Sequence, residues 1–237
     1  MGAVGYVPVR PTILLFDIDG TLIDSTSVGR RALEDAFDEL YGRRDAIDGF
    51  RLDGMTDPAI VRQGLAAIGA PFANDAVARV LDNYLTRLEH HIGAVPLETY
   101  IVHPGVRESV DRAHHAGYAV GLGTGNIVPG ARIKLGKVGL FERFDFGGFG
   151  SDAEDRPTLL RRGAERGARH LGVALSECRV VVIGDTPKDI AAATAIGAQC
   201  LAVATGHYDT ATLATHGCER AVASLETAEA GQMLFGS

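Results

Sequence analysis

Short, continuous apolar runs recur along the chain and alternate with segments of helical periodicity. The runs lie at Thr12–Phe16, Tyr118–Gly123, Arg179–Gly184 and Gln199–Ala204. Apolar runs of this length, without polar alternation, are typical of strands buried on both faces of a parallel sheet. Because helix-like stretches separate them, the pattern predicts an α/β fold, a Rossmann-like parallel sheet with helices on both faces.

The interval after the first strand is too long for one crossover. The chain runs from Asp24 to Gly105 before the segment that leads into the second strand, whereas a βαβ crossover needs only about a dozen residues. Apolar residues at helical spacing within it predict three amphipathic helices. Those helices are expected at Val28–Tyr41, Pro58–Gly69 and Ala76–His91.

These inserted helices predict a second domain, a small all-α cap over residues 25–103. The cap would end near His103-Pro104-Gly105, where proline and glycine suit a hinge or turn. Residues 1–24 and 104–237 would then form the α/β core.

Two carboxylates follow the first predicted strand. Asp17 and Asp19 are spaced i, i+2 and lead directly into Gly20-Thr21. The carboxyl edge of an open α/β sheet is where such folds bind ligands. Neighbouring acids repel each other, so they are tolerated mainly when a cation lies between them or one holds a proton. Both arrangements serve phosphoryl transfer, while an ordinary acidic turn is the alternative.

Polar groups also follow two later strands. Thr124, Gly125 and Asn126 follow the second strand, where a hydroxyl and loop amides can hold phosphoryl oxygens. Asp185 and Asp189 follow the third, spaced i, i+4. The alternative for residues 124–126 is an ordinary loop. The alternative for residues 185–189 is a helix N-cap followed by a first-turn proline, and such an N-cap is compatible with a metal site.

Together these stretches resemble the four motifs of the haloacid-dehalogenase-like superfamily of phosphotransferases. The Asp-x-Asp-Gly-Thr of residues 17–21 resembles the nucleophile motif, and the others follow in the family's order. The chain looks like the phosphoglycolate-phosphatase-like subgroup, with a helical cap inserted after the first strand. The resemblance covers roughly residues 12–206, and the cap matches only in length and helical pattern.

The resemblance implies roles for four acids. Asp17 would attack phosphorus and form an aspartyl-phosphate, and Asp19 would act as general acid and then base. Asp17 and Asp185 would bind Mg²⁺ directly, and Asp19 would bind it through its backbone carbonyl. Asp189 would act through water or by orienting Asp185.

By the same resemblance, Thr124, Gly125 and Asn126 would bind the transferring phosphoryl group. The family's third motif normally adds a lysine, commonly before a proline that opens a helix. Arg156, before Pro157, takes that place here, and an arginine can neutralise and orient a phosphate as well. The alternatives are Lys134 and Lys137, on a predicted helix without an adjacent proline, or a merely solvated charge cluster around Arg156.

Residue identities narrow the reaction. Dehalogenating relatives lack the second acid of the first motif, so Asp19 argues against dehalogenation. Phosphonate-cleaving relatives use a cap lysine, and no lysine precedes Lys134 in this chain. The expected function is hydrolysis of a small phosphomonoester, such as phosphoglycolate, a sugar phosphate or a nucleotide. A phosphomutase like β-phosphoglucomutase is the alternative, and a non-catalytic phosphate-binding module has no need for both acids.

The predicted cap supplies the candidates for choosing this small phosphorylated metabolite. Arg51 and Thr56 lie in a predicted loop before a helix, and Arg62 follows within that helix. Arg51 or Arg62 would meet a carboxylate or second phosphate of the substrate, and a solvent-facing arginine is the alternative.

The composition of the chain limits which partners and which cellular compartment are expected. The net charge of −7 argues against nucleic acid, which needs a basic face. Three cysteines fit no metal spacing and favour the reducing cytoplasm. No apolar run approaches the roughly 20 residues of a membrane span, and Met1–Arg10 lacks the pattern of a secretory signal. The segment His207–Ser237 and the oligomeric state yield no prediction.

Overall fold

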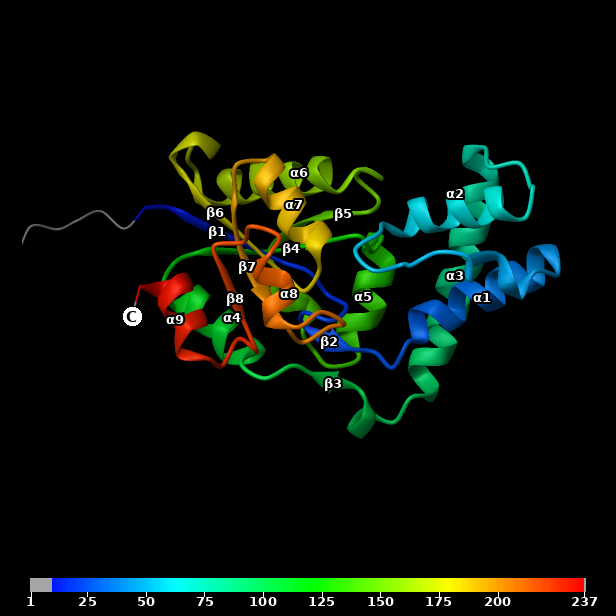
Figure 1. Ribbon diagram of the computed structural model, residues 1–237, viewed down its shortest axis with the longest axis horizontal. Helices are drawn as coiled ribbons and strands as arrows, with labels where there is room; N and C mark the ends of the chain where they lie inside the picture. Colours follow the sequence, from blue (N-terminus) through cyan, green and yellow to red (C-terminus); the bar gives the residue numbers. More distant parts are fainter. Residues whose placement is uncertain (1–9, 237) are drawn as a thin grey trace, which may run out of the picture.

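A six-stranded parallel sheet forms the centre of the computed structural model, which describes residues 10–236 (Figure 1). Its strand order is β5-β4-β1-β6-β7-β8. The parts of the predicted core at residues 1–9 and 237 lie outside the described range. The predicted parallel α/β architecture is confirmed. The strands are β1 (Thr12–Phe16), β4 (Ala119–Thr124), β5 (Phe146–Phe149), β6 (Arg179–Gly184), β7 (Gln199–Val203) and β8 (Arg220–Val222).

The four strands predicted from apolar runs are the four central ones, within one residue at their ends. The edge strands β5 and β8 were not predicted. β5 has two glycines between its two phenylalanines, and glycine weakens a strand's signal because it has no side chain to pack. β8 has only three residues, too few to form a recognisable run.

Helices cover both faces of the sheet, as predicted. Leu14 and Phe16 of β1 belong to the cluster that includes residues of α4, α5 and α9, whereas Ile13 and Leu15 belong to the cluster with α6, α7 and α8. Every residue of β1 is buried, which explains why its sequence shows no polar alternation. These helices are α4 (Val106–His115), α5 (Val128–Gly136), α6 (Arg156–Leu171), α7 (Pro187–Ala195), α8 (Thr210–Ala214) and α9 (Ala228–Phe235). Within the described part of the chain, none of the helices is both long and apolar enough to cross a membrane.

Three helices form a body beside the sheet, which we call the helical unit (Figure 1). They lie between β2 (Ile23–Asp24) and β3 (Ile101–Val102), which pair antiparallel, so that the chain leaves the core and returns to it at one place. The helices fall where the apolar spacing predicted them, and the division into core and cap at residues 25–103 stays a prediction. They are α1 (Val28–Tyr41), α2 (Asp57–Ala67) and α3 (Asn74–Ala94).

Two glycines of the helical unit predict opposite effects of the same substitution. A Cβ at Gly64 of α2 would lie 2.6 Å from Cζ of Phe37, so Gly64→Ala should lower the free energy of unfolding by about 1–3 kcal/mol. Gly93 of α3 has open space around it, so Gly93→Ala should raise that free energy by up to about 1 kcal/mol. Urea unfolding of both variants tests the packing, and changes of the same sign would contradict it.

Candidate active site

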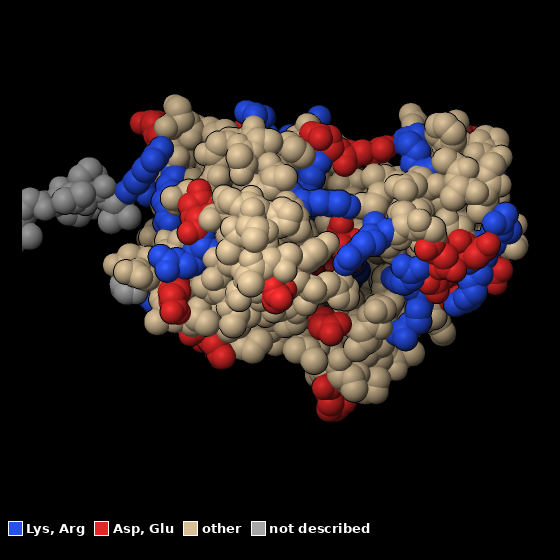
Figure 2. Space-filling view, viewed as in Figure 1, with Lys and Arg blue, Asp and Glu red and all other residues tan. Residues whose placement is uncertain are grey.

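A cleft of about 830 Å³ lies between the carboxyl edge of the sheet and the helical unit. Asp17, Asp19 and Asp185 line it from the core, and Gly29 and Tyr84 line it from the helical unit. Figure 2 shows basic side chains gathered where the two bodies meet. The basic residues that line the cleft are Arg30, Arg51, Lys134 and Arg156.

The acids meet because β1 and β6 are neighbours in parallel register. Phe16 pairs with Ile183, and the Asp17 backbone N–H donates to the Ile183 carbonyl at 2.9 Å, so both strands end together. One oxygen each of Asp17, Asp185 and Asp189 lies within 4.8 Å of the others. Gly20 makes this approach possible, since its φ is +79° and a Cβ there would lie 2.4 Å from Oδ2 of Asp185.

These buried acids have too few cationic partners to balance their negative charge. Desolvation raises the pKa of Asp17 to about 6, although the Arg156 guanidinium opposes the rise. Desolvation, then Asp189 and Asp17, raise the pKa of Asp185 well above its usual range. Among residues 10–236, no lysine, arginine or histidine nitrogen forms an ion pair with Asp185; the Thr21 hydroxyl donates to it at 3.0 Å. Carboxylates of this kind fit a hard divalent cation such as Mg²⁺.

Arg156 lies against the predicted nucleophile. Its Nη2 is 2.9 Å from Oδ2 of Asp17 and 2.5 Å from Oδ1 of Asp189. Its Nη1 donates to the Gly54 carbonyl at 3.3 Å, and only 7 % of its surface is exposed. The guanidinium is therefore part of the buried acidic site and does not belong to a solvated charge cluster.

Asp189 serves the local structure as well as the charge balance. Its Oδ2 accepts hydrogen bonds from the Thr186 N–H (3.1 Å) and hydroxyl (2.6 Å), and the Asp189 N–H donates back to that hydroxyl, a reciprocal cap on α7. The residue is fully buried and does not line the cleft. Asp189 thus contacts Arg156 from the side away from the cleft. The i, i+4 spacing of Asp185 and Asp189 in the sequence could not reveal this contact.

Lys134, which the sequence offered only as an alternative to Arg156, contacts the second acid of the first motif. Its Nζ lies 2.6 Å from Oδ2 of Asp19, to which Asn126 Nδ2 also donates at 2.9 Å. Desolvation raises the pKa of Asp19, but the charge and hydrogen bond of Lys134, together with hydrogen bonds from Asn126 and Ser25, hold that pKa below its usual range. The available signal was a lysine on the buried side of a predicted helix, next to Leu135.

The loop after β4 is only partly open to the cleft. Gly125 and Asn126 line it, whereas Thr124 is fully buried, and its Oγ1 accepts hydrogen bonds from the Asn126 backbone N–H (3.3 Å) and Nδ2 (3.0 Å). A Cβ at Gly125 would lie 2.1 Å from the Met55 carbonyl, so the helical unit packs directly on this loop. Phosphate binding by these three residues stays a prediction.

The three predicted specificity residues lie in different places. Arg51 lines the cleft, but 69 % of its side chain is exposed and its Nη2 is 2.6 Å from Asp53. The Thr56 hydroxyl donates to the Glu154 carbonyl at 3.2 Å, and Arg62 pairs with the Glu154 carboxylate at 2.7 Å. Thr56 and Arg62 do not line the cleft; they join the helical unit to the core. A role for all three in substrate choice stays a prediction.

Asp57 closes this junction. Its N–H donates to the Gly125 carbonyl at 2.8 Å, and its Oδ2 accepts a hydrogen bond from the Ile127 N–H at 2.9 Å. Burial raises the pKa of Asp57 to about 6, against the opposing charge of Lys134. The start of α2 is therefore docked on the core beside the acids.

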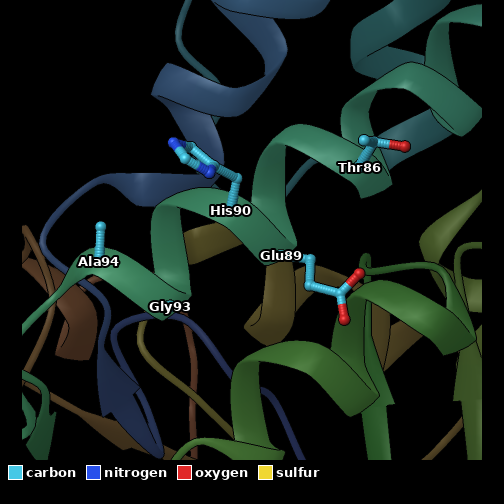
Figure 3. A pocket seen from close by; sticks show the side chains of 5 residues that line it. All are labelled: Thr86, Glu89, His90, Gly93 and Ala94. Atoms are coloured by element: carbon cyan, nitrogen blue, oxygen red, sulfur yellow. The ribbon is translucent and has the colours of Figure 1, made fainter.

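A second depression lies on the surface of α3 (Figure 3). The side chains of Glu89 and His90 point away from each other there, so no polar groups converge on a ligand. It is lined by Thr86, Glu89, His90, Gly93 and Ala94. The cleft at the sheet edge, by contrast, brings acidic and basic side chains together.

Known proteins resemble the chain in sequence. Residues 11–197 match the family model of the haloacid dehalogenase-like hydrolases. A phosphoglycolate phosphatase of Cereibacter sphaeroides is 31% identical over 191 residues, 78% of this chain and 81% of the relative. A phosphoglycolate phosphatase of Pseudomonas fluorescens is 26% identical over 207 residues, 83% of this chain and 71% of the relative.

Solved structures share the fold. CbbY from Rhodobacter sphaeroides, in complex with phosphate, superposes with a TM-score of 0.68 at 19% identity, over 92% of this chain and 98% of that one. β-Phosphoglucomutase from Clostridium difficile superposes with a TM-score of 0.69 at 15% identity, over 95% and 97% of the two chains. The family match over residues 11–197 and the 31% identity to a phosphoglycolate phosphatase establish that the chain belongs to the haloacid dehalogenase-like hydrolase family, as a phosphatase.

Proposed function

We propose that the protein is a Mg²⁺-dependent phosphatase that hydrolyses a small phosphomonoester through an aspartyl-phosphate on Asp17. The observation that carries this proposal is the pairing of each acid of the first motif with its own cation. Arg156 contacts Asp17 at 2.9 Å, and Lys134 contacts Asp19 at 2.6 Å. Both acids line the cleft; Asp17 is buried, whereas 42 % of the Asp19 side chain is exposed.

The reaction has two displacements at phosphorus. In the first, an Asp17 oxygen forms a bond to phosphorus, the ester P–O bond breaks, and the leaving oxygen takes a proton from the Asp19 carboxyl. In the second, Asp19 accepts a proton from a water as its oxygen attacks phosphorus, and the bond to Asp17 breaks, releasing inorganic phosphate. Arg156 supplies positive charge beside the phosphoryl oxygens in both displacements.

The metal would be held by the Asp17 and Asp185 carboxylates and the Asp19 backbone carbonyl. When bound, Mg²⁺ supplies charge neutralisation for the phosphoryl group and for the acids themselves. Asp189 contributes by holding Arg156 and by its charge next to Asp185. The buried acids of this sheet edge, whose negative charge is only partly balanced by cations, support these residues as the metal ligands.

The helical unit would act as a cap over residues 25–103 and select the leaving group. Its contacts to Gly125, Ile127 and Glu154, next to the cleft, support this role. A cleft of about 830 Å³ suits a small phosphorylated metabolite. The relatives named phosphoglycolate phosphatase make phosphoglycolate the first substrate to try, and a CbbY structure with xylulose 1,5-bisphosphate makes a sugar bisphosphate the second. The free cysteines are consistent with a cytoplasmic enzyme.

Asp17→Asn should abolish phosphate release, because an amide oxygen cannot serve as the nucleophile. We expect a fall in kcat of at least about 100-fold with p-nitrophenyl phosphate and with 2-phosphoglycolate. Asp75→Asn, on the exposed first turn of α3, is the matched control and should retain activity. Turnover by Asp17→Asn at the wild-type rate would refute the proposal. Transfer of phosphate to a second hydroxyl, instead of to water, would identify a phosphomutase.

Mg²⁺ should stabilise the folded protein, because it relieves repulsion among buried carboxylates. At a concentration near 100 times its Kd, a ligand that binds only the folded state adds about 2.7 kcal/mol. The rise in Tm on adding Mg²⁺ to EDTA-treated protein measures this effect without reference to activity. Asp185→Asn should remove most of the rise, and an undiminished rise in that variant would exclude Asp185 as a ligand.

Arg156→Lys should keep the charge but lose its reach to two acids. The guanidinium contacts Asp17 and Asp189 from one nitrogen and Gly54 from another, which a single ammonium cannot reproduce. We expect kcat/KM to fall by about 10-fold in Arg156→Lys and by a further factor of about 10 or more in Arg156→Met. Arg162→Lys, on the exposed side of α6, is the control. Full activity in Arg156→Met would show that the guanidinium has no catalytic role.

A further inference from the structure

Lys134 has no task in the two displacements described, yet its ammonium is buried against Asp19. Only 5 % of the Lys134 side chain is exposed, against 42 % for Asp19. Burying an ammonium group away from water is unfavourable unless a partner compensates its charge. In α5, Lys134 lies where its ammonium reaches Asp19, the predicted general acid, at 2.6 Å.

The two buried cations of the site divide the two acids between them. Arg156 reaches Asp17 from the start of α6, and Lys134 reaches Asp19 from α5. Each acid of the first motif therefore has a buried cation of its own, Arg156 next to the predicted nucleophile and Lys134 next to the predicted general acid.

Three donors restrain both oxygens of the Asp19 carboxyl group. Lys134 Nζ at 2.6 Å and Asn126 Nδ2 at 2.9 Å share Oδ2, and the Ser25 hydroxyl donates to Oδ1 at 3.4 Å. The donors come from the helix α5, the loop after β4 and the linker before α1, so the group has little freedom to rotate. Restraint of this kind is what a general acid needs to meet a leaving oxygen in the correct geometry.

The helical unit leaves room for this contact. A Cβ at Gly29 of α1 would lie 3.2 Å from Nζ of Lys134 and 3.9 Å from the Tyr84 hydroxyl. Any larger side chain at position 29 would compete with the ammonium for the same space. The glycine thus keeps Lys134 beside Asp19 where the helical unit covers the cleft.

We propose that Lys134 is a positioning residue for Asp19: its ammonium orients the carboxyl group and stabilises the carboxylate left when Asp19 protonates the leaving group. The proton passes from the Asp19 carboxyl to the ester oxygen as the electron pair of the breaking P–O bond moves to that oxygen. Lys134 keeps its own protons throughout. This inference rests on the proposed function.

Lys134→Met tests this role through the leaving group. The ratio kcat/KM covers the steps up to departure of the leaving group, so it isolates the proton donation. p-Nitrophenolate departs without a proton, whereas benzyl alkoxide needs one, and the two esters are close in size. We expect kcat/KM to fall about 10- to 100-fold with benzyl phosphate and less than about 3-fold with p-nitrophenyl phosphate.

Three further variants separate positioning from a merely structural effect. Lys137→Met is the matched control, since Lys137 Nζ donates to the Ile92 and Val95 carbonyls outside the cleft and its loss should not change the ratio between the two substrates. Lys134→Arg keeps the charge and should recover part of the benzyl phosphate activity. Asp19→Asn combined with Lys134→Met should be no slower with benzyl phosphate than Asp19→Asn alone.

The outcomes are distinct. An equal fall with both substrates, or additive losses in the double variant, would overturn the positioning role while leaving the phosphatase intact. If thermal unfolding shows that Lys134→Met does not fold, Lys134→Arg and the double variant Asp19→Asn with Lys134→Gln take its place. The ratio of kcat/KM between benzyl phosphate and p-nitrophenyl phosphate is then compared in the same way. Absence of turnover in the wild-type protein would overturn the proposed function, and this inference with it.

Discussion

The burial of several carboxylates at one sheet edge is the constraint on which the rest of the structure depends. Asp17, Asp185 and Asp189 lie within 4.8 Å of one another in a desolvated site. Carboxylates so close repel one another, which would separate the ends of the strands or cause a carboxylate to take up a proton. The fold opposes this with Arg156 inside the cluster and Lys134 beside Asp19, and a divalent cation would complete the balance.

This electrostatic requirement explains several structural choices around the edge. The parallel register of β1 and β6 brings their ends together, and Gly20 adopts a left-handed conformation where a side chain would collide with Asp185. Thr186 and Asp189 cap α7 reciprocally, so one carboxylate both starts a helix and restrains Arg156. The helical unit docks on the core beside this edge through backbone and side-chain hydrogen bonds.

The different environments of Asp17 and Asp19 suggest how one motif supports two roles. Asp17 is buried and contacts a guanidinium that cannot lose its charge, which suits a nucleophile that must stay in place. Asp19 is partly exposed in the cleft, where its carboxyl group can exchange protons with a leaving group or a water, and the donors around it hold its orientation. Tertiary structure differentiates two residues that are chemically identical in the sequence.

By itself the sequence determined the parallel α/β core, the inserted helices and the acids at the sheet edge, because buried strands and amphipathic helices follow from local apolar patterns and parallel strands end at one edge of a sheet. It did not reveal β5 and β8, whose short or glycine-rich segments carry little hydrophobic signal. Only the tertiary structure decided which cation serves which acid. Lys134 and Asp19 are far apart in the chain, and nothing local to either marks the contact. The docking of Thr56 and Arg62 on Glu154 was likewise decided by how the helical unit packs on the core.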